Sequence, residues 1–163
     1  MQEKLKKFIL LPVLMLVLAA CGVVQTPEEI DTPETETPTI GEEVSVEEGE
    51  SYTHQQDVVD YLDSFGELPP NYLTKKEARE LGWDAKEGNL WDVAPDASIG
   101  GDHFGNFEEL LPEEDGRDYY EADVNYEGGH RGAERVVFSD DGLYFYTDDH
   151  YESFLELKPG GEE

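Results

Sequence analysis

The sequence predicts an α+β domain in which N-terminal helices pack on a C-terminal antiparallel β-sheet of about five strands. Apolar residues recur at helical spacing in the first half of the region that can fold, and after Asp92 the pattern changes to period two with turn residues. That region runs from about residue 53 to residue 158, a length that suits one domain with one core. Helices followed by strands favour this class over an alternating α/β fold.

The first 20 residues have the composition of an export signal. Lysines precede an apolar run from Phe8 to Ala20, which is short for a membrane span. The run ends in Leu-Ala-Ala-Cys-Gly, which resembles the bacterial lipobox, where the cysteine is lipidated and becomes the mature N-terminus. Cys21 is the only cysteine, so we expect it to carry lipid and to anchor the protein at the outer face of the bacterial cell membrane. The alternative is an ordinary secretory signal with a chance cysteine.

Residues 21–52 are expected to form a disordered acidic tether. From Val23 to Tyr52 the chain holds ten acidic residues and no cation, without helical or strand periodicity. A flexible chain of about 30 residues has a root-mean-square reach of roughly 30 Å. A folded prodomain is the alternative. Residues 53–158 would then be the functional domain and residues 159–163 a short tail.

Cations are scarce, so their positions are informative. The formal net charge is -29, and residues 21–163 carry 8 of the 11 Lys and Arg but 39 of the 40 acidic residues. Three of those cations, Arg117, Arg131 and Arg135, fall between residues 116 and 151. The same stretch contains Glu121 and His150, a carboxylate and an imidazole suited to acid/base chemistry on a phosphate.

Two helices are expected in the first half. Val58, Tyr61, Leu62 and Phe65 mark one amphipathic face, and Gly66 is placed to end that helix. Next, residues 74–77 (Thr-Lys-Lys-Glu) form a capping box, and Gly82 closes a short second helix. The two lysines at its start are either solvated surface charge or part of a phosphate site, since a helix N-terminus favours anions.

The strands follow in the second half. A tight hairpin is indicated by Asp141-Gly142, because this dipeptide between apolar runs favours a two-residue turn. The segments with period-two patterns are 98–103, 118–124, 135–138, 143–147 and 153–157.

Many of these residues resemble, in order and with almost no gaps, the barnase/binase family of microbial guanyl-preferring ribonucleases. The resemblance covers about a hundred residues, from near Val58 to near Leu157. The matching segments are 70–78, 81–83, 88–90, 92–95, 98–102, 116–117, 121–126, Arg131, Arg135 and 147–151. The resemblance implies the microbial ribonuclease fold.

It also implies a reaction, the cleavage of RNA through a 2′,3′-cyclic phosphate that is then hydrolysed. Glu121 matches the family's general base and His150 its general acid, with the roles exchanged in the second step. Such a pair predicts a bell-shaped pH profile whose limbs belong to the coupled pair. Taken singly, each residue is more typical of a solvated surface position than of a catalytic one.

Further roles follow from the same resemblance. Lys75, Arg131 and Arg135 match positions that hold the scissile phosphate and stabilise the transition state. Asp123 matches a position that pairs with the two arginines, and Tyr151 one that contacts substrate.

Guanine recognition in the family comes from a loop that here corresponds to Phe104, Gly105, Asn106, Phe107 and Glu108. The expected contacts are backbone amides to the base carbonyl and the Glu108 carboxylate to its N1 and N2 protons. The sequence departs from the family at Phe107, where the best-known members carry an arginine.

The acidity is a second departure, because the familiar members are basic and attract RNA by charge. An RNA substrate and a monomer are expected, with no cofactor or metal. A barstar-like inhibitor is a conceivable partner, although such an inhibitor is itself acidic.

Two other functions remain open from the sequence. A binding lipoprotein could keep the fold without the activity. A metal enzyme could use His54, His103, His130 and His150 with carboxylates, although no H-E-x-x-H or comparable ligand spacing is present.

Overall fold

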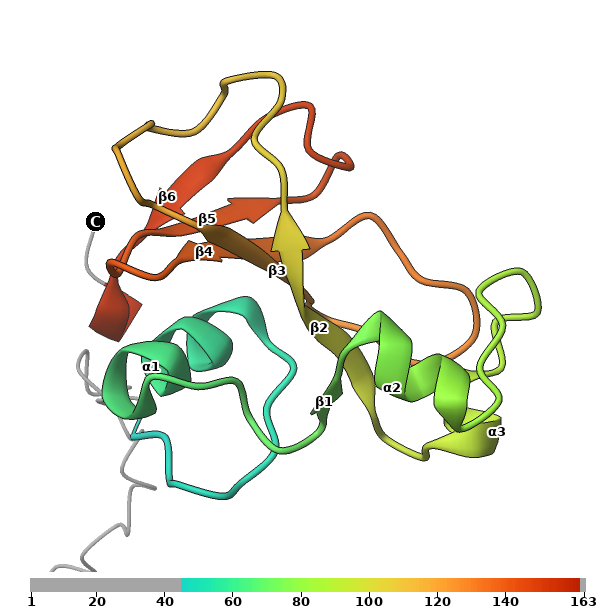
Figure 1. The fold of residues 1–163 in the computed structure, drawn as a ribbon. Coiled ribbons are helices and arrows are strands. Elements are labelled where there is room, and N and C mark those ends of the chain that lie inside the picture. Colours follow the sequence, from blue (N-terminus) through green and yellow to red (C-terminus); the bar gives the residue numbers. More distant parts are fainter. Residues whose placement is uncertain (1–44, 162–163) are drawn as a thin grey trace, which may run out of the picture. The chain divides into compact units, whose positions relative to one another are not determined.

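The computed structural model describes residues 45–161, which contain helices packed on one six-stranded sheet (Figure 1). The expected signal segment, Cys21 and most of the expected tether lie outside the described residues. The elements are α1 (Gln55–Phe65), β1 (Tyr72–Leu73), α2 (Lys75–Glu80), α3 (Leu90–Val93), β2 (Ser98–Phe104), β3 (Tyr119–Asp123), β4 (Arg135–Ser139), β5 (Tyr144–Thr147), β6 (Leu155–Leu157) and a 3-10 turn (Pro159–Gly161).

The sheet order follows the chain from β1 to β6, and the five later strands form an antiparallel meander. This confirms the α+β class. The strand that was not predicted is β1, which pairs in parallel with β2 over only two residues. Two residues are too few to show a period of two in the sequence. The four-residue helix α3 was not expected either.

Helix α1 packs on one face of the sheet. Its fully buried Val58 and Val59 share a core cluster with Val136 of β4 and Tyr144 of β5. Gly66 ends the helix in the left-handed conformation (φ 72°), and its N–H donates to the carbonyl of Leu62 at 2.8 Å. Burial of each such side chain stabilises the fold by about 1.5–3 kcal/mol.

Helix α2 begins at the expected capping box. The Thr74 side chain accepts from the N–H of Glu77, and the Glu77 carboxylate accepts from the N–H of Thr74. Ala78 packs into a second core cluster with Trp83 and Ile99, which fixes α2 beside β2. The first residue of this helix, Lys75, is therefore held at a defined place next to the sheet.

The opposite face of the sheet carries the candidate catalytic residues. Because side chains alternate along a strand, Tyr119, Glu121 and Asp123 point away from the α1 side. The register places Glu121 beside Val137 and Asp123 beside Arg135. Val137 and Tyr119 belong to a third core cluster on this face.

Both ends of the described chain are attached to the domain. Tyr52 and Asn71 exchange two hydrogen bonds, at 3.2 and 3.0 Å, so part of the segment assigned to the tether lies on the folded domain. At the other end, the N–H of Gly160 donates to Asp60 at 2.7 Å, so the expected tail begins as part of the domain. Within residues 45–161 no helix has the length and apolarity needed to cross a membrane.

Candidate active site

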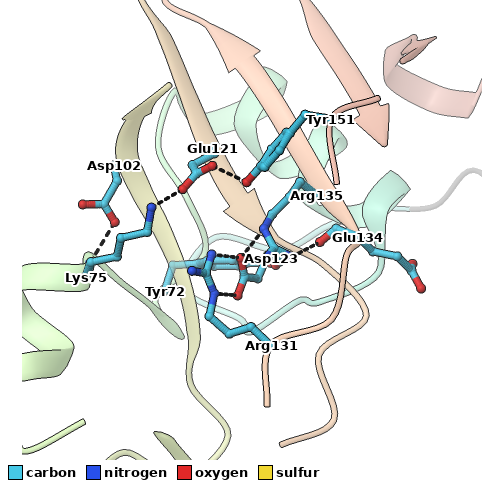
Figure 2. A network of polar contacts seen from close by, with 9 residues as sticks. All are labelled: Tyr72, Lys75, Asp102, Glu121, Asp123, Arg131, Glu134, Arg135 and Tyr151. Atoms are coloured by element: carbon cyan, nitrogen blue, oxygen red, sulfur yellow. Dashed lines mark hydrogen bonds and ion pairs between the residues drawn. The ribbon is translucent and has the colours of Figure 1, made fainter. Parts of the chain in front are cut away.

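Glu121 is the centre of the site. Its side chain is only 8% exposed, and its two carboxylate oxygens accept hydrogen bonds from the Lys75 ammonium and the Tyr151 hydroxyl (Figure 2). Burial raises the pKa of Glu121, but the hydrogen bonds from Lys75 and Tyr151 and the charges of Lys75 and Arg131 lower it more. The carboxylate is therefore held ionised, as a general base must be.

Tyr151 remains a hydrogen-bond donor in this arrangement. Burial, and then its bond to the Glu121 carboxylate, raise the pKa of the Tyr151 hydroxyl well above its ordinary value. A carboxylate has about four lone-pair positions, so Glu121 keeps acceptor capacity for a substrate hydroxyl after these two bonds.

A second cluster lies two residues further along β3. Asp123 accepts two hydrogen bonds from the Arg131 guanidinium, and its Oδ1 lies 2.8 Å from Arg135 Nε. The side chains of Asp123 and Arg135 are each only 3% exposed, whereas that of Arg131 is 19% exposed. The hydroxyl of Tyr72 donates to the Asp123 carbonyl at 2.8 Å and secures the strand there. Both arginines are thus oriented by one buried carboxylate.

The backbone of β2 brings Lys75 to Glu121. Gly100 pairs with Ala122 but Asp102 pairs with Glu121, so Gly101 is an extra residue, a β-bulge with φ 86°. The bulge places Asp102 where its Oδ2 accepts from the N–H of Lys75 at 2.8 Å. This bond fixes the start of α2 and so the root of the Lys75 side chain.

His150 lies in a constrained loop after β5. It and Tyr151 both have positive φ, 60° and 71°, which is costly for residues with a side chain. Asp149 supports the turn, because it accepts from the N–H and hydroxyl of Ser153 at 3.0 and 2.6 Å and from the Thr147 hydroxyl at 2.8 Å. Thr147 in turn accepts from the N–H of Tyr151 at 3.1 Å. The His150 ring is exposed, 6.0 Å from the Tyr151 ring.

The expected guanine segment follows β2. The Phe104 ring lies 5.2 Å from the Tyr151 ring, so the segment begins beside the site. Asn106 donates to the carbonyl and accepts from the N–H of Leu111, which closes a turn. Phe107 and Glu108 are exposed. A hollow of about 600 Å³ borders the segment, but its wall includes none of the residues around Glu121.

The match to a family model decides the family. The model described as ribonuclease matches residues 55–158, well over half of the chain. The chain belongs to the ribonuclease family.

Three curated relatives of this ribonuclease-family chain agree. A ribonuclease of Heyndrickxia coagulans is 50% identical over 62% of the chain and 93% of its own length. A ribonuclease of Bacillus intermedius is also 50% identical, but the match spans only 62% of that protein. Guanyl-specific ribonuclease St of Saccharopolyspora erythraea is 49% identical over 54% of the chain and 78% of its own length. A solved structure of ribonuclease Sa2 with guanosine-2′-cyclophosphate is 37% identical over 37% of the chain and 64% of its own, with a TM-score of 0.34.

The structure thus brings together most of the residues singled out in this ribonuclease-family sequence. Lys75, Glu121 and Tyr151 form one contact group, and Asp123, Arg131 and Arg135 form the other. Glu108 makes no side-chain hydrogen bond or ion pair with any residue from 45 to 161. No signal in the sequence indicated a role for Asp102 or Tyr72, because both act through backbone groups.

The four histidines do not converge on a metal site. His103 is close to one carboxylate, with Nε2 3.4 Å from Asp118 Oδ1. Across residues 45–161 there is no group of three or more His, Cys, Asp or Glu side chains placed to hold a metal ion.

Proposed function

We propose that this protein is an endoribonuclease that cleaves single-stranded RNA 3′ of guanosine, first by transphosphorylation to a 2′,3′-cyclic phosphate and then by hydrolysis. The observation that carries the proposal is Glu121, an almost buried carboxylate held ionised beside a paired arginine cluster. Guanosine preference is supported by the similarity to the guanyl-specific relative.

In the first step Glu121 takes the proton of the guanosine 2′-hydroxyl. The 2′-oxygen then forms a bond to phosphorus while the bond from phosphorus to the 5′-oxygen of the next nucleoside breaks. His150, protonated beforehand, gives its proton to that leaving oxygen. In the second step His150 removes a proton from water, and the water oxygen forms a bond to phosphorus while the bond from phosphorus to the 2′-oxygen breaks. Glu121 returns its proton to that 2′-oxygen, which leaves the 3′-phosphate.

Three cations serve the phosphate. Lys75 is paired with Glu121, whereas Arg131 and Arg135 share the single carboxylate of Asp123, so the arginine pair retains positive charge. Since Asp123 fixes the arginines before substrate arrives, their donors need little reorganisation when charge develops on the phosphoryl oxygens. The reaction as written needs no metal ion.

The site is tested with three proteins in chelator: wild type, Glu121→Ala and His150→Ala, each on a GpN dinucleoside phosphate. We expect cleavage by wild type and a loss of about 100-fold or more for each variant, which is the usual contribution of one acid/base group. Equal cleavage by all three would refute the site assignment. No cleavage by wild type would favour the alternative, a binding module with this fold.

We propose further that Cys21 carries lipid and holds the domain at the outer face of the cell membrane, with the acidic segment that follows it as the connection. The support is the lipobox-like sequence before the only cysteine. Replacement by Cys21→Ser should release the protein into the medium and remove the lipid mass from its N-terminal peptide. An unchanged membrane fraction would contradict the anchor.

A further inference from the structure

Phe107 is the most exposed large apolar residue of the described domain. Phe107 is 90% exposed, whereas the other exposed large apolar residues, Leu81, Leu110 and Leu155, are 51–62% exposed. The ring lies over Gly105, where an added Cβ would come within 2.4 Å of Phe107 Cε2. A glycine at 105 therefore leaves the space that the ring occupies.

The loop that carries this ring is structured. The Asn106 side chain holds both backbone groups of Leu111 at 2.9 and 3.0 Å, and Leu111 is itself buried. Within the turn, the N–H of Phe107 donates to the Gly105 carbonyl at 2.8 Å, and that of Glu109 to the Asn106 carbonyl at 3.1 Å. A ring on a fixed backbone loses little conformational freedom when it binds a ligand.

The ring is close to the proposed site. Gly105 directly follows Phe104, whose ring is 5.2 Å from that of Tyr151, and the Tyr151 hydroxyl is bonded to Glu121. An RNA strand bound at Glu121 would therefore pass near this loop.

Charge gives the loop no means of holding RNA. Residues 104–116 contain five acidic side chains and no lysine or arginine. The adjacent Arg117 donates to the Pro112 carbonyl and is paired with Asp141, so the acidic side chains dominate and phosphates are repelled there. The face of a nucleobase is uncharged, and base–aromatic stacking contributes binding energy without any cation.

We infer that Phe107 is a stacking subsite for a nucleobase next to the guanosine at the cleavage point. The inference rests on the proposed function, because it supplies a second base contact to the same RNA. Stacking on the uncharged ring supplies part of the RNA-binding energy that a basic surface would otherwise supply through electrostatic attraction.

The test compares wild type with Phe107→Ala, Phe107→Leu and Phe107→Trp, because a 90% exposed side chain can be replaced without unfolding the domain. Three oligonucleotide substrates are used, each with one guanosine. One carries every base, the second has an abasic residue 5′ of the guanosine, and the third has an abasic residue 3′ of it. Leu155→Ala, which removes an exposed apolar side chain from β6, is the control.

On the complete substrate we expect Phe107→Ala to lower kcat/KM about tenfold, mainly through KM, which corresponds to 1.4 kcal/mol. The Leu variant should behave like Ala, the Trp variant like wild type, and the loss should be similar at low and high salt. On one of the two abasic substrates wild type and Phe107→Ala should be equal, and that position identifies the stacked base.

An equal loss on all three substrates, or no loss beyond that of Leu155→Ala, would overturn the stacking subsite. These outcomes leave the proposed function intact as long as wild type cleaves at the guanosine. If wild type does not cleave the complete substrate, the proposed function itself has failed.

Discussion

Removal of Asp123 from its buried pair with Arg135 should lower the stability of the domain by a large amount. Both side chains are 3% exposed, so Asp123→Ala leaves the Arg135 guanidinium buried with only the Glu134 carbonyl, at 2.6 Å, as an observed acceptor. Removing one partner of a buried pair costs about 3–5 kcal/mol. For a domain of about 100 residues, this loss lowers Tm by more than about 10 °C.

Arg131→Ala should cost less, about 1–3 kcal/mol, because Asp123 keeps Arg135 and solvent reaches the 19% exposed position. Lys158→Ala is the matched control, since it breaks an exposed ion pair with Glu156 that should matter by less than about 1 kcal/mol. The assay is urea unfolding at neutral pH with the m-value compared among variants. If Asp123→Ala is no less stable than Lys158→Ala, the buried pair does not organise the site.

Three further predictions concern the acid and base. In Lys75→Ala the pKa of Glu121 should rise, because Lys75 is the group that most strongly opposes the effect of burial. The acidic limb of the kcat/KM profile should therefore move to higher pH. An unmoved limb would contradict this. The pKa of Asp149 is about 2 rather than 3.8, chiefly because of its bonds to Ser153, so its stabilisation of the loop is complete above about pH 4 and is lost as the pH falls through 2. The Ser153 amide should titrate by NMR near pH 2, and a midpoint near 4 would disprove this. Asp149→Ala should release the loop that carries His150 and so lower kcat more than it raises KM. Asp149→Asn should retain most activity, and equal effects of the two substitutions would argue against a role of Asp149 in positioning His150.

The acidity of the chain predicts an unusual response to salt. The domain repels RNA at long range, and raising ionic strength from about 0.01 to 0.15 M shortens the Debye length from about 30 to 8 Å. Cleavage by wild type should therefore first become faster with added salt, because distant carboxylates are screened before the local cations. A steady fall in kcat/KM from the lowest salt would show that attraction dominates.

The sequence predicted the elements whose signals are local. The Thr74/Glu77 capping box is such a signal, and its helix begins where expected because both hydrogen bonds form within four residues. Strand β1 could not be predicted in this way, since its two residues become a strand only by pairing with β2.

The residues of the candidate site could be proposed from the sequence, but the groups that position them could not. The resemblance to a known family singled out Glu121 and Arg131. The Gly101 bulge, which places Asp102 next to the start of α2, depends instead on the pairing of β2 with β3. The positive φ of His150 was likewise hidden, because it depends on a side-chain network around Asp149 rather than on glycine.

The nature of the first product tests the central claim most directly. Guanylyl-(3′→5′)-cytidine, with the 2′-deoxyguanosine form as control, is incubated with the protein in chelator and followed by ³¹P NMR. We predict that guanosine 2′,3′-cyclic phosphate appears first, that it decays to the 3′-phosphate, and that the deoxy substrate stays intact. Cleavage of the deoxy substrate, or a product with phosphate on the cytidine 5′-oxygen, would contradict the mechanism.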